Sequence, residues 1–291
     1  MGYSGRYHAA SLAAVFLALA VGILIGVGFG SDIVNGTADS LEKSLHADID
    51  NYREQVDDLQ QQLGEQGQFS RLAAPALVDG RLQRRRIALV ALGGLDDAIA
   101  ADVRGSVQQS GGQLTEVAVV REPPNIGAVA DASRGGSQRP LPRGTAFDRA
   151  TKRSGRLLVR GGKGFAGLRA ALLTRYSGEP GRIDGVVVVR ERPPTGSARE
   201  ERDTDQLESE LVAGMTDTKV PVVGVETTDT ADSSITFFDA NASASVDNVN
   251  ELPGKVALVY TLDCAQGNYG VKDSADSLLP DLLAQGNSRC R

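Results

Sequence analysis

A run of 21 uncharged and mostly apolar residues, 9–29, constrains this chain more than any other feature of its sequence. At about 1.5 Å per residue, a helix of this length crosses a hydrocarbon layer of about 30 Å. The alternative is a cleaved signal peptide, whose apolar core is usually shorter, and Gly28-Phe29-Gly30 is a poor cleavage site. We therefore expect an uncleaved transmembrane helix over residues 9–30, preceded by a cytoplasmic tip of residues 1–8.

Basic residues flank only the N-terminal end of this run. Arg6 precedes it, whereas Asp32 lies at its exit and the first basic residue beyond it is Lys43. The positive-inside rule then places the N-terminus in the cytoplasm and everything after about Ser31 outside. Since no second apolar run of comparable length follows, we expect a single-pass protein of the lipid bilayer.

Small residues recur at four-residue intervals within the apolar run. Such a ridge lets two helix backbones approach closely in the membrane, although small residues are also common in spans that do not pair. The pattern alone therefore leaves helix pairing open. The ridge comprises Ala14, Ala18, Gly22, Gly26 and Gly30.

Residues 31–68 carry a narrow apolar seam in a polar surround. Its members alternate at spacings of four and three residues over about three heptads, which is typical of a coiled coil. We expect a coiled-coil stalk, ended by Gly64 and Gly67, that pairs in parallel with a second copy. An intramolecular hairpin and a docking helix for another protein are the alternatives. The seam comprises Leu45, Ile49, Tyr52, Val56, Leu59 and Leu63.

From about Arg81 the pattern changes to short β-branched runs that alternate with helical stretches. Continuous Val-rich runs of this kind predict an α/β domain over residues 81–291, with a mostly parallel sheet and helices on both faces. Residues 121–155, rich in Pro, Gly, Arg and Ser, are expected to form a long basic loop. The expected strands are 86–92, 114–120, 185–190, 220–225, 235–239 and 255–262, and the expected helices are 96–109, 165–176 and 203–215.

Composition excludes several functional classes. With 31 basic and 37 acidic residues, the chain has a formal net charge of −6, which disfavours a nucleic-acid partner. Two Cys, two His and two Met are too few for a conventional zinc, haem or iron–sulfur site, so we expect no metal ligands. Both histidines, His8 and His46, precede the domain, which excludes Ser-His and Cys-His catalysis there. We therefore expect no catalytic residues and no enzymatic activity.

One motif has the spacing of a dinucleotide-binding turn. Residues 162–167, Gly-Lys-Gly-Phe-Ala-Gly, follow the strand-like run 157–159 and precede an apolar stretch. The fingerprint belongs after the first strand of such a domain, however, and here it lies in the middle of the domain. We expect no bound cofactor.

Charge is distributed unevenly along the domain. Residues 121–175 hold twelve basic and three acidic residues, whereas residues 200–281 hold seventeen acidic and four basic ones. The two segments therefore form either solvated faces or surfaces that attract each other.

The only thiols are Cys264 and Cys290. Outside the cytoplasm they can form a disulfide that closes a loop of about 25 residues and contributes about 3 kcal/mol. Two free thiols are the alternative, and copper(I) is a third because it favours soft sulfur ligands.

The string 6–20, Arg-Tyr-His-Ala-Ala-Ser-Leu-Ala-Ala-Val-Phe-Leu-Ala-Leu-Ala, strongly resembles the start of the actinobacterial copper transport protein B (MctB) family. Gly22, Gly26 and Ser31-Asp32 continue the match, as do Pro253–Val259 and Gly267–Gly270 nearer the C-terminus. The resemblance implies a cell-envelope protein with a role in copper efflux or homeostasis, described for the family as an outer-membrane channel that removes copper.

The same family includes septation proteins of the SteB type, which pair with a membrane partner and control cell-wall hydrolases through a coiled coil. The resemblance therefore also implies an alternative role as a septation scaffold. Expected partners are a second copy or a membrane protein at the stalk, and a cell-wall hydrolase or an anionic envelope polymer outside. A role for copper is implied only by the family resemblance and not by the residues themselves.

Overall fold

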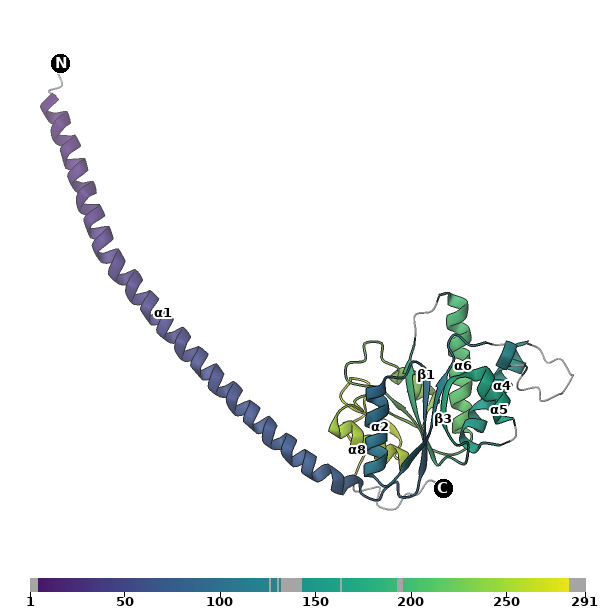
Figure 1. The fold of residues 1–291 in the computed structure, drawn as a ribbon. Helices are drawn as coiled ribbons and strands as arrows, with labels where there is room; N and C mark the ends of the chain where they lie inside the picture. The colour runs from purple at the N-terminus through teal and green to yellow at the C-terminus, as the bar shows by residue number, and fades with distance from the viewer. Residues whose placement is uncertain are drawn as a thin grey trace. The chain divides into compact units, whose positions relative to one another are not determined.

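The computed structural model describes residues 5–125, 127–129, 131, 143–162, 164–192 and 196–282. The chain divides into two compact units, Met1–Gln68 and Phe69–Arg291. The described part of the first is helical, and the second is an α/β domain (Figure 1).

A single helix, α1 (Gly5–Val78), runs through the whole of the expected span and stalk. Its segment Tyr7–Val27 has a mean hydropathy of 2.6 and is long and apolar enough to cross a membrane, so the expected N-terminal apolar helix is confirmed. Gly64 and Gly67 do not end the helix, contrary to expectation. An isolated glycine costs a helix only about 1 kcal/mol, and here good helix formers such as Gln and Leu surround both glycines.

Within the described residues, seven strands form one sheet in the order β3-β2-β1-β4-β5-β6-β7. All neighbouring strands are parallel except β2 and β3, which are antiparallel, so the expected mostly parallel sheet is confirmed. The strands are β1 (Arg86–Gly93), β2 (Gln113–Val120), β3 (Leu173–Gly178), β4 (Gly185–Glu191), β5 (Val222–Val225), β6 (Ala244–Val246) and β7 (Gly267–Tyr269).

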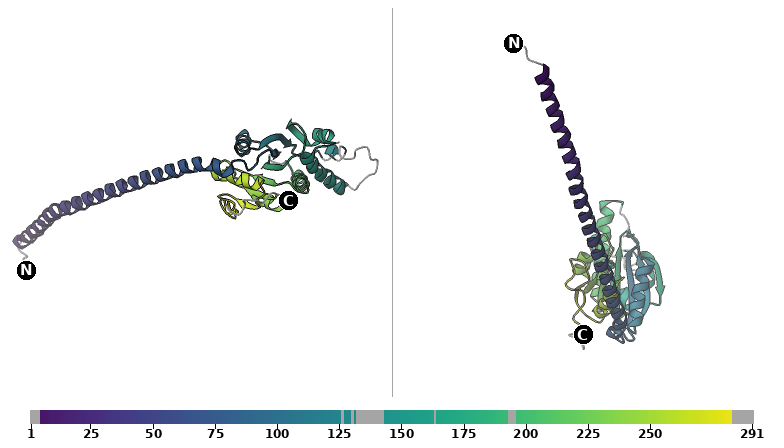
Figure 2. Two further views of the ribbon diagram at one scale, coloured as in Figure 1. Left: turned by 90° about the horizontal axis from the view of Figure 1, so that it is seen from below. Right: turned by 90° about the vertical axis from the view of Figure 1, so that its left-hand side faces the viewer.

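Helices cover both faces of the sheet, and each face has its own apolar core (Figures 1 and 2). One core combines α2 (Asp97–Gln109) and α8 (Leu252–Leu262) with Ala74 and Val78 of the last turns of α1. The opposite core is formed by four other helices. These are α4 (Arg143–Arg160), α5 (Phe165–Leu172), α6 (Ala198–Thr216) and α7 (Ile235–Asn241).

Two runs that were expected to be strands, 235–239 and 255–262, are the helices α7 and α8. In α8, every residue from Val256 to Leu262 is buried, so the helix has no polar face that would reveal a 3.6-residue period. A short apolar run does not by itself distinguish a buried strand from a buried helix. Pro253 in the first turn is the helix-start signal that this interpretation missed.

The expected loop 121–155 is also wrong in its C-terminal part, because α4 occupies residues 143–160. Its buried positions follow a helical period, but small or polar residues fill half of them: Phe147, Ala150, Thr151, Ser154, Leu158 and Val159. The run 157–159 therefore belongs to a helix, and the glycine motif at 162–167 joins α4 to α5. Without a strand before it, the motif is not a dinucleotide-binding turn.

The expected helix 165–176 is too long. It ends at Leu172, and the chain turns directly into β3, which pairs with β2 at the edge of the sheet. Burial favours this strand: Tyr176 packs edge-to-face on Phe165 and donates a hydrogen bond of 3.0 Å to the buried carboxylate of Glu116.

Candidate functional site

The crevice at the carboxyl ends of β1 and β4 is where open α/β sheets usually bind ligands, because strand order reverses there. Here two carboxylates occupy it. A Cβ added to Gly94, in the turn after β1, would lie 2.8 Å from Oε2 of Glu191. Asp96 caps α2 and accepts a 2.7 Å hydrogen bond from the backbone N–H of Ala98. The N-terminus of α2, where a phosphate group could otherwise bind, is thus already in contact with the carboxylate of Asp96.

A cavity of about 210 Å³ lies at the same edge, between the ends of β4 and β5. Asp96, Glu191 and Asp229 line it together with Arg190. A 2.5 Å hydrogen bond from the hydroxyl of Thr227 lowers the pKa of Asp229, which keeps that carboxylate charged. The cavity is therefore polar and predominantly acidic.

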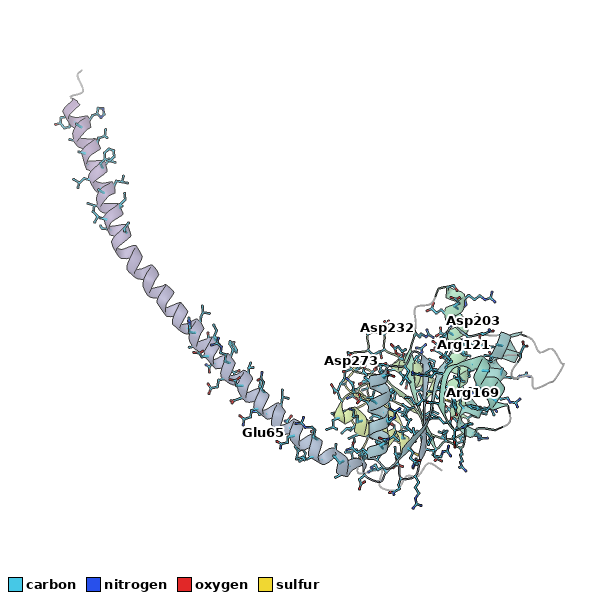
Figure 3. The ribbon with its side chains drawn as sticks, viewed as in Figure 1. Glu65, Arg121, Arg169, Asp203, Asp232 and Asp273 are labelled. Atoms are coloured by element: carbon cyan, nitrogen blue, oxygen red, sulfur yellow. The ribbon has the colours of Figure 1, made fainter. Side chains whose placement is uncertain are left out.

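The acidic character extends along this edge of the domain. In Figure 3, Asp232 and Asp273 are seen on the side of α2, and Asp203 is seen beside Arg121 on the side of α6. Acidic side chains therefore lie on both sides of the sheet at this edge.

Two arginines bind one buried carboxylate at the end of β4. The Nη2 atoms of Arg190 and Arg192 lie 2.8 Å and 2.6 Å from Oε2 of Glu208, whose side chain is fully buried in α6. Both arginines also pair with Asp205, and the guanidinium of Arg190 lies 4.1 Å from the ring centroid of Phe237. These contacts fix the end of β4 to α6.

A second carboxyl group, that of Glu122, completes this cluster. Burial, followed by the charge of the nearby Glu208, raises the pKa of Glu122 to about 8. Both carboxyl oxygens of Glu122 and Oε1 of Glu208 are buried without a hydrogen-bond partner among the described residues. The raised pKa favours the neutral form of the Glu122 carboxyl group at neutral pH.

A further ion pair holds the segment after β7 against the end of β5. Nζ of Lys272 lies 2.6 Å from Oε1 of the buried Glu226, which also accepts hydrogen bonds from Ser233 and Ser234. Asp247, at the end of β6, accepts hydrogen bonds from the backbone N–H groups of Val271 and Lys272. The carboxyl edge is thus held together by internal ionic contacts.

The six residues of the predicted seam are all exposed on α1, with 46–67% of each residue's surface accessible. Their apolar surface is left without a partner among the described residues. In the span, added Cβ atoms at Gly22 and Gly26 would meet nothing within 4 Å, and Ala14 and Ala18 are exposed. Gly30 lies outside the residues whose side chains are described. Pairing through the seam or the ridge stays a prediction.

Cys264 is disulfide-bonded in the structure. Its expected partner, Cys290, lies outside the described residues, so the pairing itself stays a prediction.

A family model described as "Copper transport outer membrane protein, MctB" matches residues 3–157 and 161–280. The chain belongs to the MctB family. The resemblance of the N-terminal string is thereby confirmed. Together with the apolar helix in α1, membership fits a copper-related, membrane-anchored protein of the cell envelope.

Two MctB-family relatives carry the name "Copper transporter MctB", one from Mycobacterium tuberculosis and one from Mycobacterium bovis. Each is 34% identical to this chain over 110 residues, which cover 38% of this chain and 35% of the relative. The aligned segment thus spans about a third of each relative's length.

The described residues do not provide a copper site. They include no group of three or more His, Cys, Asp or Glu side chains arranged to hold a metal ion. Met215 is fully buried in the apolar core, and Cys264 is held in a disulfide, so neither offers copper(I) a free soft ligand. Copper is the cargo in the family's name, and this chain's described side chains do not fit its coordination.

Sequence reasoning missed the Glu122–Glu208 cluster and the Lys272–Glu226 pair. The available signal was positional, because Arg190, Arg192 and Glu226 each stand at or just beyond the end of a Val-rich run. Charged residues at such positions gather at the carboxyl edge of a parallel sheet.

Proposed function

We propose that this MctB-family protein is a single-pass cell-envelope protein that serves copper homeostasis as a non-catalytic scaffold. In this proposal α1 anchors the chain in the membrane and pairs in parallel with a second copy. The α/β domain lies outside the cytoplasm, as the position of Arg6 before the span favours.

The observation that carries the proposal is the exposed seam on α1. Six large side chains at heptad spacing are about half exposed or more, and covering one such side chain contributes about 1.5–3 kcal/mol. A second copy supplies an identical seam in register, so that each helix covers the apolar side chains of the other. The small residues of the span support the same pairing inside the bilayer.

Two observations favour a non-catalytic role. Neither histidine of the chain lies in the α/β domain. The charged groups at its carboxyl edge are largely engaged with one another, as in the binding of Glu208 by Arg190 and Arg192. Since the described side chains do not form a copper site, we propose that the protein contributes to copper handling by assembling a complex and not by coordinating copper.

The test measures the mass of the full-length chain in lipid nanodiscs. The wild type and Gln61→Asp, on the polar side of the helix, should be dimers, whereas Leu59→Asp should be monomeric because it buries a charge in the seam. Cells that depend on the Leu59→Asp variant should also lose copper tolerance. A Leu59→Asp dimer, or full tolerance with that variant, would contradict the proposal.

The SteB-type septation role is the alternative, and it uses the same seam with a different chain. A wild-type monomer whose Leu59→Asp variant disturbs cell division but not copper tolerance would support that role instead.

A further inference from the structure

A cavity of about 500 Å³ opens at the amino edge of the sheet, opposite the acidic crevice. Arg85, Asp184 and Pro221 line it, and each lies next to the first residue of a strand: β1, β4 and β5, respectively. A second cavity of about 360 Å³ adjoins it, sharing Arg182 and Val220.

Cations dominate the lining of both cavities. Five cations come from four segments of the domain: Arg81 and Arg85 from the turn before β1, and Arg160, Arg182 and Lys219 from three others. Asp184 is the carboxylate of the lining, and one of its oxygens accepts a 3.0 Å hydrogen bond from the backbone N–H of Arg86.

One wall of the cavity is held in place by contacts inside the domain. Arg81 and Arg85 share the carboxylate of Asp263, at 3.5 Å and 2.6 Å. The guanidinium of Arg81 lies 3.7 Å from the ring centroid of Tyr260, and Arg85 donates a 2.9 Å hydrogen bond to the carbonyl oxygen of Leu262. Two guanidinium groups that share one carboxylate leave one net positive charge on a preorganised surface.

The facing side chains have no such pairing. Arg182 and Lys219 are exposed, and neither has a carboxylate partner within 4 Å among the described residues. Lys219 also has a backbone φ of 69°, in the left-handed region that a residue with a side chain rarely adopts. The turn after α6 thus holds a lysine at the cavity despite an unfavourable backbone conformation.

We propose that this amino-edge cavity binds a phosphate-bearing anion. Like charges that converge from several elements repel one another, and a polyvalent oxyanion relieves that repulsion. Guanidinium forks match the oxygens of phosphate groups, and the lysine adds a point charge that follows the ligand. This inference goes beyond the scaffold role and does not depend on pairing through α1.

The phosphate group has two possible sources in the envelope, a small free anion and a phosphodiester polymer. Calorimetric titrations of the full-length chain in a non-ionic detergent distinguish them, with inorganic pyrophosphate and a poly(glycerol phosphate) oligomer as probes. Binding of pyrophosphate supports a small anion, and binding of the oligomer alone supports a polymer.

The decisive variant is the double change Arg182→Gln and Lys219→Gln, which should weaken binding at least tenfold. Its matched control, Arg104→Gln with Arg153→Gln, removes the same charge from exposed positions on α2 and α4 and should change affinity less than twofold. Both altered pairs are exposed, and circular dichroism checks that each variant folds. If neither probe binds, or if the control variant weakens binding as much as the double change at Arg182 and Lys219, the proposal is overturned.

Discussion

Gly155 of α4 and Gly214 of α6 face each other where the two helices cross. A Cβ on Gly155 would overlap the carbonyl oxygen of Leu211, and one on Gly214 would overlap the carbonyl oxygen of Lys152. The helices therefore pack backbone to backbone at this point. Lys152 also lies 3.5 Å from Asp217 at the end of α6, so the basic and acidic segments of the chain meet here.

We expect Gly214→Ala to destabilise the domain by about 2–3 kcal/mol, because the added methyl group must push α4 away from α6. Gly105→Ala is the matched control: Gly105 lies in α2 with nothing within 4 Å of its would-be Cβ. There the same substitution should stabilise by about 0.5–1 kcal/mol. Denaturant unfolding, followed by near-ultraviolet circular dichroism of the tyrosines, measures both. Effects of the same sign would contradict the packing described here.

Glu122→Gln should make the domain less sensitive to alkaline pH. Because the pKa of Glu122 is raised to about 8 in the folded chain, the wild type keeps a proton that the unfolded chain releases near its ordinary value of 4.5. Wild-type stability must therefore fall as the pH rises from about 4.5 to 8, and then level off.

The glutamine variant has no carboxyl group at position 122 to ionise, so it lacks this slope. Its advantage over the wild type should be small at pH 5 and exceed about 1 kcal/mol at pH 9. Melting temperatures across that range measure it. Glu201→Gln, on the exposed first turn of α6, is the control. Parallel curves for wild type and Glu122→Gln would contradict the raised pKa of Glu122.

Lys272→Met should cost about 3 kcal/mol, because it leaves the carboxylate of Glu226, only 4% exposed, without its cation. Arg199→Gln breaks an ion pair with Asp203 in which the arginine side chain is 85% exposed, and solvent screens that pair. We expect the second change to leave the midpoint of denaturant unfolding nearly unaltered. Similar midpoints for both variants would show that the Lys272–Glu226 contact does not stabilise the domain.

The proposed orientation predicts that alkaline phosphatase, fused after the last residue, is active in intact cells, since that enzyme needs an oxidising compartment to form its disulfides. A fluorescent protein that folds only in the cytoplasm should remain dark at the same position. Replacing Arg6 with Glu and Asp32 with Lys inverts the flanking charge and should reduce the phosphatase activity. Unchanged activity would mean that these charges do not set the orientation.

Much of the fold is predictable from the sequence because continuous apolar runs bounded by glycine, as at β1 and β4, are typical of buried parallel strands. The apolar helix is predictable from length alone. The predictions fail for helices that do not have one apolar buried face and one polar exposed face. α8 is buried on all sides, and α4 has threonine and serine on the face that packs into the core. A search for large apolar residues at helical spacing therefore misses both helices.

The charged clusters were less accessible to sequence reasoning. Glu122 and Glu208 are 86 positions apart in sequence, and their contact depends on how α6 packs beside the end of β2. Likewise Arg81, Arg182 and Lys219 converge only because strand order brings β1, β4 and β5 side by side. Tertiary proximity of this kind has no local signature.

The two outer strands of the sheet differ in length, yet each is a poor template for a further strand. β7 has only three residues, and β3 carries Arg175 exposed at its centre and a left-handed glycine, Gly178, at its end. Short or charged edges resist the addition of strands from neighbouring molecules. In the proposed paired assembly, copies at high local concentration on a membrane would therefore keep their sheets separate, which would protect that assembly from aggregation.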